Sequence, residues 1–173
     1  MEELLELGQA AGQLLVERRQ TIAVAESSAA GLISAALLSV PGASAYFIGG
    51  TVVYTRTSRT TLLDIPESAL EGIRASTEAY ALLLARSVRA RLGTDWAIGE
   101  TGATGPTGNR YGDAAGHACL AVSGASEVAR TLETGHGDRV ANMYRFAATA
   151  LRLFLETAGT STGSGLSRGE IST

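Results

Sequence analysis

The sequence predicts an α/β fold, a three-layer α/β/α sandwich on a mixed β-sheet. Short apolar runs alternate with longer segments of helical spacing, which is typical of parallel α/β sheets. Near the end of the chain, two strand-like runs flank the turn SGAS and indicate an antiparallel hairpin. A chain of 173 residues is the size of one domain. We expect that domain to cover residues 1–157 and a polar, flexible tail to cover residues 158–173.

The first half of the chain contains helix, strand and helix in turn. Leucines and alanines recur at helical spacing over Glu2–Arg19, and Thr21–Ala25 is a short apolar run that indicates a buried strand. Helical spacing resumes over Gly31–Val40 and ends at a Pro-Gly pair. Thr51–Tyr54 is β-branched and aromatic, so it is the next predicted strand, entered through two glycines. A short helix over Thr57–Leu63 follows.

The second half adds a long helix, a glycine-rich loop, the hairpin and a last helix. Ser76 is the expected N-cap of the first of these helices, and Gly93 ends it. The predicted elements are a helix at Thr77–Leu92, a strand at Trp96–Gly99, a loop at Glu100–Gly116, strands at His117–Val122 and Val128–Thr134, and a helix at Arg139–Leu155.

Composition excludes several classes of partner. The net charge of −3 gives no basic field for a polyanion, so we expect no nucleic-acid partner. No apolar run is long enough to span a membrane, and the acidic, amphipathic N-terminal segment favours a cytoplasmic protein without a membrane partner. The single cysteine, Cys119, lies in an apolar run and is predicted to be a core residue. All 14 basic residues are arginines, so a mechanism that needs a lysine has none here.

The stretch AVAESSAAGLIS carries the clearest sign of chemistry. The predicted strand stops at Glu26, Ser27 and Ser28, and helical spacing begins directly afterwards. A hydroxyl at a strand end beside a helix N-terminus suits acyl transfer, because free N–H groups there can hold a developing oxyanion. The alternative is that Ser27 or Ser28 only caps the helix.

Three motifs in order resemble the C-terminal domain family of competence/damage-inducible protein A (CinA), the nicotinamide-nucleotide amidases. They are AESSAAGLISAAL, VPGASAYFIGGTVVYT, and TGATGPTG with the trailing GDAAGHACLAV, and the likeness covers Thr21 to Leu155. The resemblance implies hydrolysis of the carboxamide of nicotinamide mononucleotide to nicotinate mononucleotide and ammonia. It also implies a serine nucleophile with a lysine and a tyrosine. At the matching positions this chain has Ser27 for the serine, Tyr54 for the tyrosine and Arg59 for the lysine.

Arg59 departs from the family pattern. A serine nucleophile needs a base, and a guanidinium cannot accept a proton at neutral pH. One hypothesis makes Tyr54 the base, as a phenolate supported by the charge of Arg59. A second makes Glu26 the base, although adjacent side chains at a strand end tend to point apart.

The glycine-rich loop is a candidate phosphate cradle, because glycines let backbone N–H groups approach an anion. A flexible surface loop without a ligand is the alternative reading. Further departures lie in these motifs. Glu100 stands where the family has a small apolar residue, and Ser28, Ala29 and Ala30 stand where it has a cysteine, a threonine and a glycine. The predicted substrate-binding residues are Glu26, Ser28, Thr101, Gly102, Gly105, Asn109 and Arg110.

Three functions remain open at this point. The first is an amidohydrolase of a small nucleotide with Ser27, Tyr54 and Arg59 as its catalytic residues. The second is a catalytically impaired nucleotide-binding homologue, which Arg59 favours. The third is a partner-binding module. We expect no metal, because neither histidine has a ligand-spaced neighbour, and no cofactor. An apolar first helix on a small domain favours a homodimer.

Overall fold

Five strands form one mixed sheet in the computed structural model, which describes residues 1–160. The spatial order is β2-β1-β3-β4-β5, with β1 parallel to both β2 and β3, and with β4 antiparallel to β3 and β5. The strands are β1 (Ile22–Glu26), β2 (Phe47–Val52), β3 (Trp96–Ala103), β4 (His117–Ser123) and β5 (Glu127–Glu133). The predicted mixed sheet and its terminal hairpin are confirmed.

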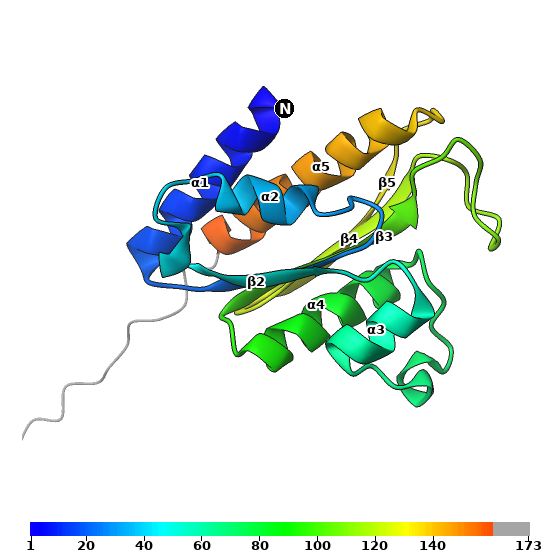
Figure 1. Cartoon of the computed structure of the whole chain (residues 1–173), viewed down its shortest axis with the longest axis horizontal. Coiled ribbons are helices and arrows are strands. Elements are labelled where there is room, and N and C mark those ends of the chain that lie inside the picture. Colours follow the sequence, from blue (N-terminus) through cyan, green and yellow to red (C-terminus); the bar gives the residue numbers. More distant parts are fainter. Residues whose placement is uncertain (161–173) are drawn as a thin grey trace, which may run out of the picture.

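Helices cover both faces of this sheet, which gives the predicted three layers (Figure 1). One layer holds α1 (Glu2–Arg18), α2 (Leu32–Leu38) and α5 (Arg139–Thr160), and the other holds α3 (Arg56–Leu63) and α4 (Glu78–Leu92). Two short 3₁₀ helices, η1 (Ala43–Ala45) and η2 (Glu67–Leu70), lie in the connections. Among the described residues, none of the helices combines the length and the apolar character that crossing a membrane requires.

Each face of the sheet has its own apolar cluster. On the side of α1, α2 and α5, the indole of Trp96 meets the ring of Phe154 edge-on at 5.9 Å between centroids. On the side of α4 the cluster is almost entirely aliphatic and includes Cys119, which is buried as predicted. Gly99 lies at the closest approach of β3 and α4, because a Cβ there would stand 2.0 Å from the carbonyl oxygen of Ala81. Small residues therefore set the distance between sheet and helix.

Strand β2 begins four residues earlier than the sequence pattern predicts and ends at Val52, so the prediction of Thr51–Tyr54 is wrong. The two glycines that were interpreted as the entry to the strand are instead part of it and pair with Ala23 and Val24 of β1. Gly50 is required there, because a Cβ would stand 2.2 Å from Ser34 Oγ. Tyr54 consequently lies in the connection after β2.

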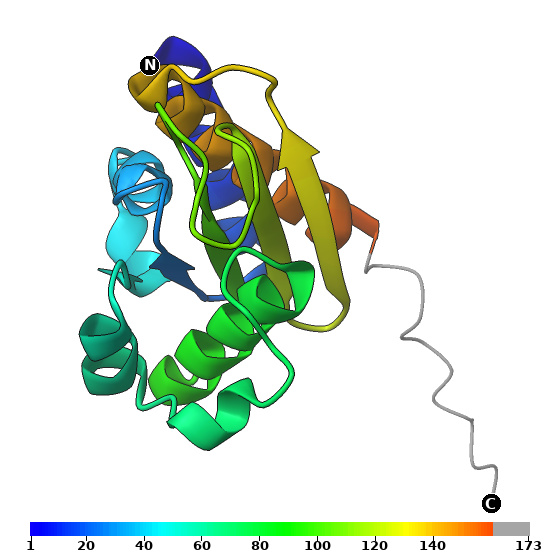
Figure 2. The same cartoon turned by 90° about the vertical axis from the view of Figure 1, so that its right-hand side faces the viewer.

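Strand β3 also extends beyond its prediction. Residues 100–103, predicted to open the loop, continue the strand and pair with residues 117–120 of β4. Their polar and glycine-rich composition hides the strand, because the pairing to β4 and not an apolar pattern holds it. The loop that remains, residues 104–116, leaves the same end of the sheet at which β1 stops (Figure 2).

The start of α4 and the end of α5 differ from the predictions as well. The N-cap of α4 is Thr77, whose side chain accepts a hydrogen bond from the N–H of Tyr80, and not Ser76, which has a left-handed φ of 58°. Helix α5 continues past Leu155 to Thr160, so residues 158–160 belong to it and not to the predicted tail. The rest of that tail, residues 161–173, lies outside the described residues.

Candidate active site

Glu26 ends β1 and caps the helix that follows. Its buried carboxylate accepts hydrogen bonds from the N–H groups of Ile33 and Ser34, at 3.1 and 3.0 Å, and from Ser34 Oγ at 2.7 Å. Burial raises the pKa of Glu26, and these hydrogen bonds partly offset that effect. Glu26 therefore occupies the N–H groups of Ile33 and Ser34 at the start of α2, and its carboxylate makes no hydrogen bond to Ser27.

The turn between β1 and α2 is held by a second carboxylate, that of Glu100 on β3. The N–H groups of Ser27 and Ala29 both donate to the same oxygen, Oε2, each at 2.8 Å. The hydroxyl of Ser28 donates to the other oxygen. The side chain of Ser27 is half-buried and its Oγ makes no hydrogen bond to the described residues. The turn thus leaves one hydroxyl free, that of Ser27.

Burial decides the protonation of Glu100. The residue is completely buried, which raises its pKa to about 7, and the nearby charge of Glu26 acts in the same direction. The hydrogen bonds from the turn favour the charged form, but they do not cancel the loss of hydration. The site therefore holds a carboxyl group that changes its charge near neutral pH.

Thr101 and Gly102, predicted as loop residues that bind substrate, lie within β3. Thr101 is buried and its Oγ1 accepts a hydrogen bond of 3.3 Å from the N–H of Ser76. A Cβ on Gly102 would stand 2.4 Å from the carbonyl oxygen of His117 and 3.0 Å from Ser28 Oγ. Gly102 thus permits the contact between strand and turn.

Tyr54 meets an arginine that the sequence reasoning did not consider. Its side chain is 63% exposed, and its hydroxyl oxygen accepts a hydrogen bond of 3.3 Å from Arg139 Nη2. The other terminal nitrogen of Arg139 donates to the carbonyl oxygen of Gly105 at 2.8 Å. Gly105 has a φ of 109°, and a Cβ there would stand 2.6 Å from the carbonyl oxygen of Gly137. Arg139 at the start of α5 therefore joins the connection after β2 to the loop.

Arg59 lies on α3 and is engaged elsewhere. Its Nη2 donates to Glu67 Oε1 at 2.6 Å, and the other oxygen of Glu67 accepts from Arg56 at 2.9 Å. The Arg59 side chain is buried, and its Nε is the one buried side-chain nitrogen or oxygen among the described residues without a hydrogen-bond partner. It makes no hydrogen bond to Ser27 or Tyr54. The arginine that supports Tyr54 is therefore Arg139.

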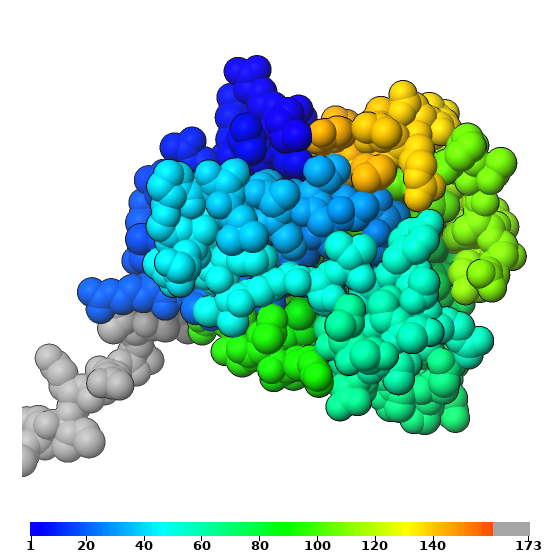
Figure 3. All heavy atoms as spheres, viewed as in Figure 1, coloured from blue at the N-terminus to red at the C-terminus, as the bar shows by residue number. Residues whose placement is uncertain are grey.

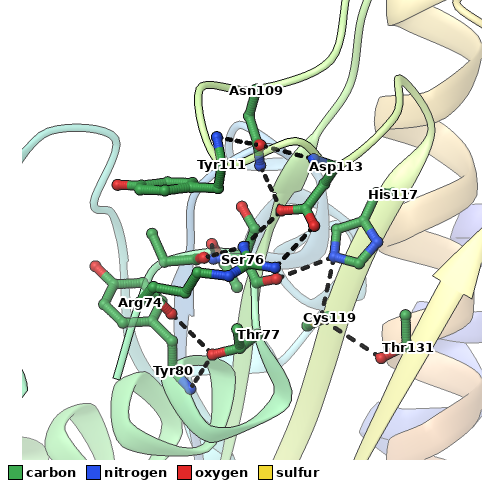
Figure 4. A network of polar contacts seen from close by, with 12 residues as sticks. Arg74, Ser76, Thr77, Tyr80, Asn109, Tyr111, Asp113, His117, Cys119 and Thr131 are labelled. Carbon is green, nitrogen blue, oxygen red and sulfur yellow. Dashed lines mark hydrogen bonds and ion pairs between the residues drawn. The ribbon is translucent and has the colours of Figure 1, made fainter. Parts of the chain in front are cut away.

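The loop between β3 and β4 is held by the polar network in Figure 4. Arg74 forms two hydrogen bonds with Asp113, at 2.7 and 2.9 Å, and its guanidinium lies 5.5 Å from the ring centroid of Tyr111. The amide of Asn109 donates to Asp113 and accepts from two backbone N–H groups of the loop. The pKa of Asp113 falls to about 2, mainly because Arg74 binds its charged form. Asn109 therefore orders the loop with its own side chain, whereas Arg110 is exposed.

His117 belongs to the same network. Its Nε2 lies 3.0 Å from the carbonyl oxygen of Ser76 and 3.5 Å from the sulfur of Cys119, and its Nδ1 is paired with Glu133. Burial would lower the pKa of His117, but the hydrogen bonds and the charge of Glu133 outweigh it and raise that pKa. These contacts join β4 to β5 and to the segment before α4. Within residues 1–160, no cluster of three or more potential metal ligands is present.

Six of the ten predicted site residues fall into three groups of contacts. Ser27, Ser28 and Gly102 lie at the turn that Glu100 holds, Tyr54 and Gly105 meet at Arg139, and Arg59 pairs with Glu67. The other four lie apart from these groups: Glu26 caps α2, Thr101 bonds to Ser76, Asn109 orders the loop and Arg110 is exposed. Figure 3 shows the region of α2 in blue, the segment after β2 in cyan to teal and the loop in yellow-green next to one another on one face.

Sequence reasoning missed Arg139 and Glu67 as contacts of the site. Arg139 lies 85 positions from Tyr54, so no local pattern joins them. The sequence marked Glu100 only as a departure from a family motif, and it gave no sign of the residues that Glu100 contacts.

Comparison with known protein families identifies the family of this chain. The model of the CinA C-terminal domain matches residues 5–158. The chain belongs to the CinA C-terminal domain family. It is 36% identical over 151 residues to a CinA-like protein of Chlorobium limicola, a match that covers 84% of this chain and 35% of that protein. A CinA-like protein of Parasynechococcus marenigrum is 41% identical over 126 residues, which cover 73% of this chain and 30% of that protein.

Solved structures support the same fold. A CinA-superfamily protein from Klebsiella pneumoniae superposes with a TM-score of 0.84 at 23% identity and covers 90% of this chain and 98% of that one. A superfamily member from Escherichia coli gives 0.83 at 24% identity and covers 89% and 90%. The chain spans about a third of the length of these two curated relatives.

Proposed function

We propose that the chain is an amidohydrolase that converts nicotinamide mononucleotide to nicotinate mononucleotide and ammonia. The observation that carries the proposal is the turn after β1, where Ser27 has the free hydroxyl at the position of the family's nucleophile. Membership of the CinA C-terminal domain family supports it.

In the proposed reaction, Ser27 Oγ attacks the carboxamide carbon, and the hydroxyl proton moves to the amide nitrogen. The carbon–nitrogen bond breaks and ammonia leaves, so an ester of Ser27 remains. Water then hydrolyses this ester and returns a proton to Ser27. Glu26 is fully engaged with α2, so Tyr54 is the sequence candidate that is left for moving the proton. The pyridine ring and the phosphate of the substrate would lie toward the loop of residues 104–116, which Arg139 and Asp113 hold.

A second function is a nucleotide-binding protein without turnover, and the environment of Arg59 favours it. Arg59 cannot accept a proton, and its ion pair with Glu67 directs its charge to α3 and η2. Both functions predict binding of the nucleotide, and they differ in the release of ammonia.

The test is ammonia release from nicotinamide mononucleotide, measured together with binding, on the natural chain, Ser27→Ala and Ser44→Ala. Ser44 is an exposed serine on η1, beside the start of β2, and serves as the matched control. The amidase proposal expects slow release that Ser27→Ala abolishes and Ser44→Ala preserves, at unchanged melting temperature. Binding without release supports the second function. Release that survives Ser27→Ala contradicts the role of Ser27.

A further inference from the structure

The two N–H groups at the Ser27 turn have the geometry of an oxyanion hole. The nitrogen atoms of Ser27 and Ala29 each lie 2.8 Å from the same oxygen atom, to which their N–H groups donate. An oxyanion hole is recognised by backbone donors 2.7 to 3.1 Å from the place of the developing negative oxygen, and a nucleophile's own N–H is often one of them. The donors belong to the turn itself, since α2 begins only at Leu32.

The oxygen at that place is Oε2 of Glu100. The side chain reaches the turn from β3, two strand positions before Gly102, whose missing side chain leaves the room for Ser28 Oγ. The hydroxyl of Ser28 donates to the second carboxylate oxygen, so three donors of the turn serve one side chain. Both Ser28 and Glu100 depart from the family motif, and the structure brings the two departures into direct contact.

We propose that Glu100 occupies the oxyanion position of the Ser27 turn and thereby determines whether this turn can bind the anionic oxygen of a substrate or intermediate. As long as the side chain is there, a tetrahedral oxygen formed at Ser27 has no access to the two N–H groups. Removing it leaves three unpaired donors around a space the size of a small carboxylate. The effect on turnover rests on the proposed function, whereas the capture of a small anion does not.

The first experiment uses formate as the probe and the variant Glu100→Ala. Amide signals are followed by ¹H–¹⁵N NMR during a titration with sodium formate, against sodium chloride at the same ionic strength. In Glu100→Ala we expect saturable shifts at the amides of Ser27 and Ala29, and a melting temperature that formate raises by a few degrees. The natural chain and Glu100→Gln should show neither effect, because an oxygen of residue 100 still fills the place.

A second variant covers the case in which Glu100→Ala does not fold. Ser28→Ala/Glu100→Ala also removes the hydroxyl that would lose its acceptor, so it leaves fewer unsatisfied groups. A folded variant without saturable formate shifts at the two amides overturns the proposal. If neither variant folds even in formate, Glu100 serves structure alone, and the proposal is overturned as well.

Ammonia release from nicotinamide mononucleotide then separates this inference from the proposed function. With the oxyanion position open, Glu100→Ala should release ammonia about tenfold faster or more than the natural chain, and formate should inhibit it. Formate capture without any ammonia release would contradict the amidase and leave the assignment of the oxyanion position intact. Ammonia release without formate capture would support the amidase and overturn the assignment of the oxyanion position.

Discussion

The buried carboxyl of Glu100 should make the stability of this protein fall as the pH rises toward neutral. Its pKa is raised from 4.5 to about 7, so the folded state binds a proton more tightly than the unfolded state. Such a group contributes its full stability below pH 4.5 and loses it as the pH rises through about 7. The gap between the two values corresponds to about 3 kcal/mol.

The perturbation that isolates this effect is Glu100→Gln, which keeps the shape of the side chain and removes the titration. The free energy of unfolding is measured by urea denaturation at several pH values from about 4.5 to about 8. Relative to Glu100→Gln, the natural chain should lose about 3 kcal/mol across this range. Glu26 is present in both proteins, so its own titration largely cancels in the difference.

Glu71→Gln is the matched control, because Glu71 is exposed and its carboxylate makes no hydrogen bond with the described residues. The free energy of unfolding of Glu71→Gln should equal that of the natural chain at every pH. Parallel curves for the natural chain and Glu100→Gln would refute the reasoning, since they would mean that the Ser27 turn stabilises the carboxylate enough to offset its burial.

Three further predictions concern other parts of the site and its support. Arg59→Lys should leave ammonia release close to that of the natural chain, because residue 59 pairs with Glu67 and makes no hydrogen bond to Ser27 or Tyr54; a large rise would contradict this and show that a lysine there acts as the base. Arg74→Gln should increase hydrogen exchange in residues 104–116, because it removes both hydrogen bonds to Asp113. Unchanged exchange would contradict the role of Arg74 in holding this loop. Gly99→Ala should lower the free energy of unfolding by about 1 to 3 kcal/mol in urea denaturation, because its methyl would overlap the Ala81 carbonyl. An unchanged midpoint would contradict this.

The fold was predictable because its elements carry local signals. Helical spacing ends at capping residues, and the buried strand β1 is short and apolar up to its last residue, Glu26. The strand ends were not predictable in the same way. Gly49 and Gly50 look like a turn, yet they are held in β2 by pairing with β1, and residues 100–103 are held in β3 by pairing with β4. Such pairing is a long-range property that a local pattern does not contain.

The sequence singled out Ser27 as the candidate nucleophile, but it did not predict the surroundings of this residue. Ser27 stood out because a polar triplet interrupts an apolar run at the start of a helix. Its relation to Glu100 joins residues 73 positions apart, and that of Tyr54 to Arg139 joins residues 85 apart. The expectation that the helix N-terminus beside Ser27 offers free N–H groups to an oxyanion was wrong. Glu26 occupies the N–H groups of Ile33 and Ser34, and Glu100 occupies those of Ser27 and Ala29.

The contact between Ser28 and Glu100 also explains why these two departures from the family motif should occur together. Glu100 is fully buried beside a second carboxyl group, and such a group is tolerated only when most of its oxygen lone pairs have donors. Ser28 supplies the one side-chain donor, and the weaker thiol donor of a cysteine would serve the carboxylate less well. A small apolar residue at position 100 would instead leave the hydroxyl of Ser28 and two N–H groups without an acceptor. Each of the two residues is therefore favourable for stability only in the presence of the other. Together they place a carboxyl group of the protein where the turn could otherwise bind an external anion.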